Sequence, residues 1–221
     1  MMNIFSIFDP SSSMNFSFNW LSIIMFFLFL PFQFWLLPSR YLYLWILLIK
    51  SMFNEFKILI FYSYSNLIFF LSLFILIMFN NFLGLFPYIF TASSHMNFCL
   101  SISFSFWMSM IIYSLLNYPN NFFAHLTPLG TPSILMPFMV IIEMISLLIR
   151  PFTLAIRLTA NMVAGHLLLS LLGSSGHSIH NYMIFLLMIL SQLTLFILEI
   201  SVSLIQAYVF SILSTLYSSE I

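Results

Sequence analysis

Residues 134–172 have the sequence ILMPFMVIIEMISLLIRPFTLAIRLTANMVAGHLLLSLL, which is apolar almost throughout. The stretch contains no cluster of turn-forming residues and only three formal charges, Glu143, Arg150 and Arg157. An arginine at the centre of a membrane helix costs roughly 2.5–3.5 kcal/mol, and charged residues at such depths usually serve a function. The pattern therefore predicts a membrane helix in which Arg157 has a functional role.

The composition of the whole chain points to the same environment. Of its 221 residues, 62% are hydrophobic and only 5% are charged, and the mean hydropathy is +1.13. Soluble domains carry about 25% charged residues, so this chain has too few to cover a water-facing surface. We predict an all-α polytopic membrane protein that forms a single membrane domain over residues 1–221.

Charge and cysteine content exclude several classes of function. The net charge of zero argues against nucleic-acid binding, which needs a basic face. The single cysteine, Cys99, excludes an internal disulfide bond and a multi-cysteine metal site. We also expect no cofactor. We expect no metal ion, because the HxxH pattern at residues 177–180 lacks the further ligands of a metal site.

The N-terminal sequence bears on where the protein is made. Residues 1–19 are polar and aromatic, so we expect a surface segment without the basic residues of a secretory signal or transit peptide. A protein this hydrophobic without an import signal is expected to be bacterial or made inside an organelle. The excess of Phe, Ile, Met, Asn and Ser over Ala, Gly and Arg suggests an AT-rich coding genome, which favours a mitochondrial one.

The apolar runs predict about five membrane helices and one amphipathic helix at the membrane interface. Residues 38–65 hold three of the five basic residues, so this region should face a bacterial cytoplasm or a mitochondrial matrix. The predicted elements are a first span at 20–37, an interfacial helix at 41–62, spans at 66–88 and 98–116, and long helices at 134–172 and 181–217.

The last two segments are too long for upright membrane helices. Each would measure roughly 55–58 Å at the helical rise of 1.5 Å per residue, whereas the hydrocarbon core is about 30 Å thick. Either each helix is tilted and bent, or the first breaks near Arg150 and Pro151 into two spans. The absence of turn-forming clusters favours two tilted helices joined in a hairpin by the linker at residues 173–180.

Polar residues recur at helical spacing along both long segments. On a helical wheel, one face of the first segment collects polar side chains within about 60°. These residues are Glu143, Ser146, Arg150, Arg157 and Asn161, and the last segment carries a second stripe of Gln192, Glu199, Ser203 and Gln206.

An antiparallel hairpin would bring the two stripes together. One register pairs Arg157 with Gln206 and, to within two residues, His166 with Glu199. Glu143 would lie about 21 Å from Arg157 toward the other membrane face. The hairpin therefore offers titratable groups at separate depths on either side of a permanent cation.

This arrangement suits proton movement along two paths that an arginine separates. Carboxylates and imidazoles can relay protons within membranes, whereas an arginine stays charged at any useful pH. A guanidinium can, however, displace the proton of a nearby carboxylate by lowering its pKa. The chain itself offers no membrane carboxylate at the depth of Arg157, so we expect a partner protein to supply the carboxylate.

Four stretches of the sequence resemble one protein family. They are RLTANMVAGH at 157–166, IEMISLLIRPFTLAI at 142–156, LEISVSLIQAYVF at 198–210 and AHLTPLGTP at 124–132. All four resemble the subunit a family of the mitochondrial rotary ATP synthases. The resemblance is specific over residues 124–217, whereas the N-terminal half resembles the family only in hydropathy and in the order of its elements.

The resemblance implies a function and a set of partners. It implies a multi-pass, non-catalytic stator subunit of the mitochondrial inner membrane, beside a ring of c subunits and other membrane-sector subunits. Each c subunit carries a buried carboxylate, and protons reach and leave the ring by two offset half-channels. The transported ion would be the proton, and its passage would drive ring rotation and ATP synthesis.

The resemblance also implies roles for individual residues. Arg157 matches the essential arginine that faces the ring carboxylate and blocks a direct leak. Gln206 and Asn161 match polar residues near that arginine. The remaining matches are His166 and Glu199, on the half-channel from the intermembrane space, and Glu143, on the exit to the matrix. Arg150 receives no catalytic role, because its position need not be charged in the family.

Other interpretations of these residues remain open from the sequence alone. Arg157 could bind lipid headgroups, His166 and Glu199 could form a structural hydrogen bond, and Glu143 could be a solvated interfacial carboxylate. Gln206 and Asn161 could simply join helices, and His125, His177 and His180 could be solvated loop residues.

Two other functions of the whole protein were also considered. A serine protease is suggested only by GSSG at 173–176, and a secondary transporter would show inverted repeats that this sequence lacks.

Overall fold

A computed structural model describes residues 4–13, 16–60, 64–127, 132, 134–176 and 181–220. Within these residues the chain is almost entirely helical, and four helices are long and apolar enough to cross a membrane. These are α2 (Tyr64–Gly84), α3 (Met96–Asn117), α5 (Met136–Ser175) and α6 (Tyr182–Glu220). The predicted class, an all-α polytopic membrane protein, is therefore confirmed.

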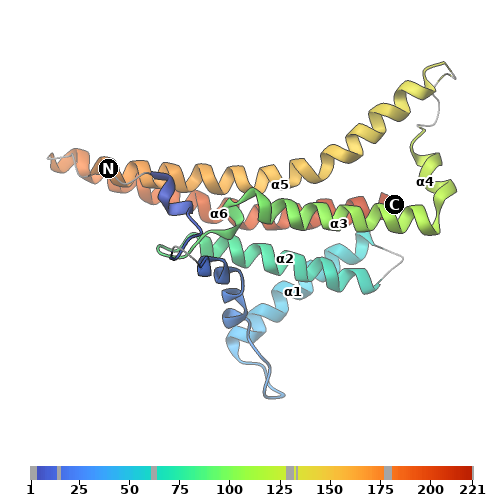
Figure 1. Ribbon diagram of the computed structural model, residues 1–221. Helices are drawn as coiled ribbons and strands as arrows, with labels where there is room; N and C mark the ends of the chain where they lie inside the picture. Colours follow the sequence, from blue (N-terminus) through green and yellow to red (C-terminus); the bar gives the residue numbers. More distant parts are fainter. Residues whose placement is uncertain are drawn as a thin grey trace.

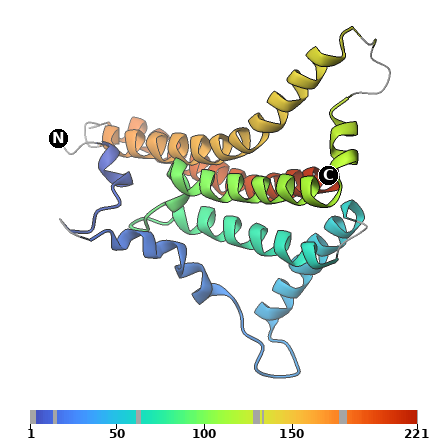
Figure 2. The same ribbon diagram turned by 45° about the vertical axis from the view of Figure 1, so that its right-hand side comes forward.

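The four long helices lie side by side and form the body of the protein (Figures 1 and 2). Helix α6 packs against both α2 and α5, and α3 packs against α5. The buried core contains Phe74 and Ile77 of α2, Leu158 of α5 and Phe210 of α6. The outward faces of the long helices are also apolar, as a lipid environment requires.

The N-terminal apolar run is shorter as a helix than the predicted span at 20–37. It forms two 3-10 helices, η2 (Phe18–Ile23) and η3 (Met25–Phe29), and residues 30–39 follow without helix. Pro31 explains this end, because proline lacks the N–H that a continuing helix needs and disfavours helical geometry at the residue before it. A further 3-10 helix, η1 (Ile4–Phe8), precedes this run.

Helix α1 (Arg40–Leu59) corresponds to the predicted amphipathic helix at 41–62. Its N-cap is Ser39, whose hydroxyl accepts a hydrogen bond from the Leu42 N–H at 3.3 Å. Phe56 is fully buried, whereas Lys50 and Glu55 are exposed. The amphipathic pattern thus holds in the fold, and the placement of α1 at the membrane interface remains a prediction.

Helices α5 and α6 are continuous over 40 and 39 residues, and they form the predicted hairpin. Each is about 60 Å long. Helix α5 does not break at Arg150 and Pro151, but it bends visibly along its length (Figure 2), and Pro151 lies inside it. A proline inside a helix removes one main-chain hydrogen bond and bends the axis, which accounts for the curvature.

Short elements connect the long helices at both ends. The turn η4 (Ala92–Ser94) lies between α2 and α3 and contacts α5. Helix α4 (Pro119–His125) follows α3, and His125 is exposed at its end. Turn-forming residues at 117–133 predict a loop between α3 and α5, whereas residues 119–125 of this stretch form α4. The rest of the stretch falls partly outside the described residues, as do His177 and His180 of the linker between α5 and α6.

Candidate functional site

Arg157 lies on an open face of α5. Its neighbours Leu154 and Leu158 are buried against the other helices, whereas Arg157 itself is exposed. No ion-pair partner for its guanidinium is found in the described part of the chain. Among the described residues the cation therefore remains available to an external group.

Gln206 joins α6 to α5 at the depth of Arg157. Its Nε2 donates a hydrogen bond to the main-chain oxygen of Arg157 at 3.1 Å, and its side chain is 6% exposed. Its Oε1 is buried without a partner among the described residues. The contact confirms the predicted antiparallel register, and it fixes the backbone that carries Arg157 while leaving the guanidinium unengaged.

The same register brings Glu199 of α6 against α5 beside His166. A Cβ atom built on Gly165 would lie 2.5 Å from Glu199 Oε1 and 2.9 Å from Glu199 Cδ. The carboxylate therefore occupies the space that the missing side chain of Gly165 leaves open. His166 Nε2 and Glu199 Oε2 are both buried without a hydrogen-bond partner in the described structure. Buried polar atoms of this kind normally bind water, so the pair is suited to a hydrated proton path.

Replacement of Gly165 by alanine is expected to displace the Glu199 carboxylate, because the new methyl group would overlap it. Glutamate is flexible, so we expect assembly to survive and the rate of proton-driven ATP synthesis to fall several-fold. The matched control is Gly173→Ala on the same helix, where the nearest atom to a built Cβ lies 3.9 Å away. Equal rates for the Gly165 variant and this control would contradict the role of the contact.

Glu143 lies near the other end of α5 and is paired with Arg150. Glu143 Oε1 is 3.7 Å from Arg150 Nη2, and the Arg150 guanidinium carbon lies 4.8 Å from the centre of the Tyr217 ring. These three side chains line a cavity of about 270 Å³ between α3, α4, α5 and α6, together with His125. The charged side chains in its lining can bind water, so the cavity can hold water around the Glu143 carboxylate.

Asn161 lies one helical turn beyond Arg157 and is exposed on α5. The exposed stripe of this helix also includes Ile156, Ala160 and Ala164. Small side chains on this stripe let another helix approach closely. Asn161 is therefore a candidate for contact with a helix that packs against this stripe beside Arg157.

Several residues of the site carry no clear sequence signal. The sequence placed Arg150 on the polar stripe without a catalytic role, and the structure shows that it forms the ion pair with Glu143. Sequence reasoning missed Tyr217 and Gly165, whose importance depends on contacts between distant parts of the chain. Asn81 of α2 is fully buried, and neither atom of its side-chain amide has a hydrogen-bond partner among the described residues. Its position inside an apolar run could have indicated this burial.

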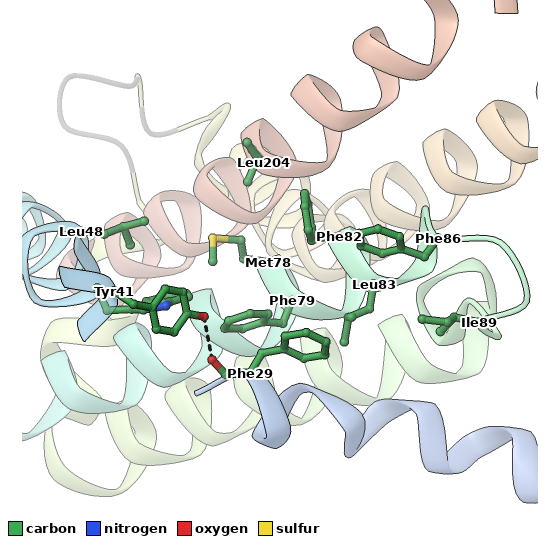
Figure 3. A pocket seen from close by; sticks show the side chains of 11 residues that line it. Phe29, Tyr41, Leu48, Met78, Phe79, Phe82, Leu83, Phe86, Ile89 and Leu204 are labelled. Atoms are coloured by element: carbon green, nitrogen blue, oxygen red, sulfur yellow. Dashed lines mark hydrogen bonds between the residues drawn. The ribbon is translucent and has the colours of Figure 1, made fainter. Parts of the chain in front are cut away.

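A second cavity lies away from these groups. It has a volume of about 590 Å³ and is lined by side chains of η3, α1, α2 and α6, including Phe29, Phe79 and Leu204 (Figure 3). The Tyr41 hydroxyl at its edge already donates a hydrogen bond to the Phe29 main-chain oxygen at 2.9 Å. The lining residues described for this cavity are almost all apolar, and they include no carboxylate or imidazole.

Side chains that could bind a metal ion were compared over the described residues. The described residues contain no group of three histidine, cysteine, aspartate or glutamate side chains that could hold an ion. The HxxH pattern at 177–180 lies outside those residues. The polar side chains of the site are carboxylates, an imidazole, amides and guanidinium groups, and of these the carboxylates and the imidazole can exchange protons.

The fold and site define a polytopic helical membrane protein with titratable side chains at successive depths of one helical hairpin. Comparison with known proteins identifies the family, because residues 2–219 match the ATP synthase A chain family. Subunit a of ATP synthase from Anopheles quadrimaculatus is 54% identical, and that from Drosophila melanogaster is 52% identical. Both comparisons cover 100% of this chain and 99% of the relative.

The chain therefore belongs to the ATP synthase subunit a family, the proton-translocating subunit of the membrane sector. It is a non-catalytic subunit of that complex and a multi-pass protein of the mitochondrial inner membrane. The family resemblance expected from residues 124–217 is thus confirmed, and it extends over almost the whole chain.

Proposed function

We propose that the α5–α6 hairpin forms two proton half-channels that Arg157 separates. His166 and Glu199 belong to the path from the intermembrane space, and Glu143 belongs to the path that leads to the matrix. The observation that carries this proposal is the hydrogen bond from Gln206 to the Arg157 main-chain oxygen. It sets the register in which Glu199 meets α5 beside His166 and leaves Glu143 at the opposite end of the hairpin.

The distances along α5 support two separate paths. His166 is nine residues from Arg157, or about 13 Å along the helix, and Glu143 is about 21 Å away in the other direction. A proton cannot cross such gaps without intervening groups or water. A fixed positive charge between the two paths also repels a hydrated proton, because the guanidinium keeps its charge at any useful pH.

The partner that completes the path is a ring of c subunits. Arg157 is exposed on α5 and lacks an ion-pair partner in the described chain, so it can face a ring carboxylate. Beside that cation the carboxylate releases its proton, because an adjacent positive charge favours the ionised form. The carboxylate then takes a proton from the Glu199 side and carries it with the ring to the Glu143 side.

The driving force enters through the charge of the proton. Each proton that crosses the membrane gains about 2.3 kcal/mol per 100 mV of membrane potential. Arg157 converts this gain into rotation, because it stops protons from passing directly between the two paths. The stator held against the ring must also include other membrane-sector subunits of the synthase.

Cysteine cross-linking in the assembled synthase tests which face of the protein meets the ring. A cysteine at Ala160, exposed beside Arg157, is expected to cross-link to a cysteine placed one turn from the ring carboxylate. The control is Ile68→Cys on α2, a residue that is 70% exposed on another face. The native Cys99 is buried and will not compete. Cross-linking from Ile68 in place of Ala160 would refute the proposed contact face.

A further inference from the structure

The N-terminal segment reaches the side chain of His166. The rings of Phe8 and His166 have their centres 6.4 Å apart and lie edge to face at 84°. The turn η1, which ends at Phe8, lies against the linker-side end of α5 (Figures 1 and 2). A segment more than 150 residues distant in sequence thus covers one side of the imidazole.

Phe8 is more buried than the residues of this turn that directly precede it. Phe5 and Ile7 are 69% and 50% exposed, whereas Phe8 is partly buried against α5. Edge-to-face aromatic pairs stabilise a contact by about 0.5–1.5 kcal/mol beyond the area that they bury. The contact therefore has a preferred geometry, and the orientation of Phe8 bears on that of the imidazole.

Hydrogen bonds on the residues after Phe8 hold the segment in place. The Ser11 N–H and hydroxyl donate to Asp9 Oδ1 at 3.0 and 2.8 Å, and Asn19 Nδ2 donates to the Asp9 main-chain oxygen at 3.2 Å. The two bonds from Ser11 also hold the pKa of the Asp9 carboxyl below its usual value. The turn is thus tied to the beginning of η2, and Phe8 has a fixed place.

We propose that Phe8 is a positioning residue for His166, covering one side of the imidazole so that its proton exchange is directed toward Glu199. This inference rests on the proposed role of His166 in proton uptake. Phe8 offers no hydrogen-bonding group, so it excludes water from the side it covers and cannot compete for the imidazole proton. Glu199 approaches α5 at the adjacent Gly165, and the buried His166 Nε2 is left to bind water or that carboxylate.

Loss of the Phe8 ring is expected to have two consequences. Water and small reagents would gain access to the covered side of His166. The imidazole would also lose its fixed orientation, so that proton exchange with Glu199 would slow. A purely structural role for Phe8 would change neither the reactivity of His166 nor the rate of proton uptake in complexes that assemble normally.

The test uses the intact synthase in membranes with Phe8→Ala, Phe8→Leu and, as the matched control, Phe5→Ala. Modification of His166 by diethyl pyrocarbonate is followed by peptide mass spectrometry, with the exposed His125 as an internal reference. We expect a several-fold faster modification of His166 in Phe8→Ala, an intermediate rate in Phe8→Leu, and no change in Phe5→Ala. Proton-driven ATP synthesis should fall several-fold in Phe8→Ala and recover in part in Phe8→Leu.

The two measurements separate the possible failures. An unchanged modification rate of His166 in both Phe8 variants would overturn the proposed cover. Faster modification with normal ATP synthesis would overturn the positioning role. A His166→Ala variant measured in parallel tests the proposed function itself, because unchanged ATP synthesis there would remove His166 from the proton path whatever the reactivity data show.

Discussion

Replacement of Arg157 by alanine is expected to abolish proton-driven ATP synthesis and to increase the passive proton conductance of the membrane sector. Two unit charges 4 Å apart interact with about 4 kcal/mol at the effective dielectric constant near a protein surface. That energy corresponds to about three pKa units on a facing ring carboxylate. Without it the buried carboxylate keeps its proton, and the barrier between the two half-channels is lost.

The measurement compares ATP synthesis with proton leak in membranes whose synthase is fully assembled. Arg157→Lys is the informative companion, because it keeps a positive charge but loses the planar fork of the guanidinium. We expect this variant to remain less leaky than Arg157→Ala while synthesising little ATP. Loss of synthesis without leak in Arg157→Ala would show that the arginine turns the ring but is not the barrier, and normal synthesis would remove it from the mechanism.

The hairpin at the centre of the site was largely predictable from the sequence. In an antiparallel hairpin, the register that pairs Arg157 with Gln206 also pairs His166 with Glu199 to within two residues. The structure confirms this register through the bond from Gln206 to the Arg157 backbone. Helical spacing fixes such pairings because each residue has a known depth and direction along a regular helix.

The parts that could not be predicted depend on contacts between distant segments. The contact of Phe8 with His166 joins a 3-10 turn to a helix far along the chain, and no periodicity encodes it. The contact of Arg150 with Tyr217 likewise joins the middle of α5 to the C-terminal part of α6. Such contacts follow from the packing of whole elements, which a pattern within one segment does not specify.

The first apolar run shows a different limit. Its hydropathy predicted a span at 20–37, but the helical part ends at Phe29, before Pro31. Hydropathy reports whether a segment suits lipid, whereas the helix boundary depends on main-chain hydrogen bonds that proline removes. The end of this helix therefore could not be predicted from hydropathy alone.

Replacement of Glu199 by glutamine is expected to slow proton uptake from the intermembrane space by about a hundredfold, the lower range for loss of a positioned proton-transfer group. The amide has almost the same shape as the carboxylate, so it can still pack against Gly165 and the fold should be preserved. It cannot, however, accept and release a proton as the acid does. The rate of ATP synthesis driven by an imposed proton gradient measures this loss directly.

The matched control is Glu55→Gln, which makes the same chemical change at an exposed carboxylate of α1 that accepts a hydrogen bond from Tyr208 at 2.8 Å. That variant should retain normal synthesis, because its carboxylate lies outside both proposed paths. The Glu199 variant should also keep a low passive leak, unlike Arg157→Ala, since the barrier between the paths remains in place. Slow ATP synthesis with a low proton leak in the Glu199 variant would show that Glu199 delivers protons and that Arg157 blocks the leak. Normal ATP synthesis in this variant would show that protons reach the ring by a route without Glu199.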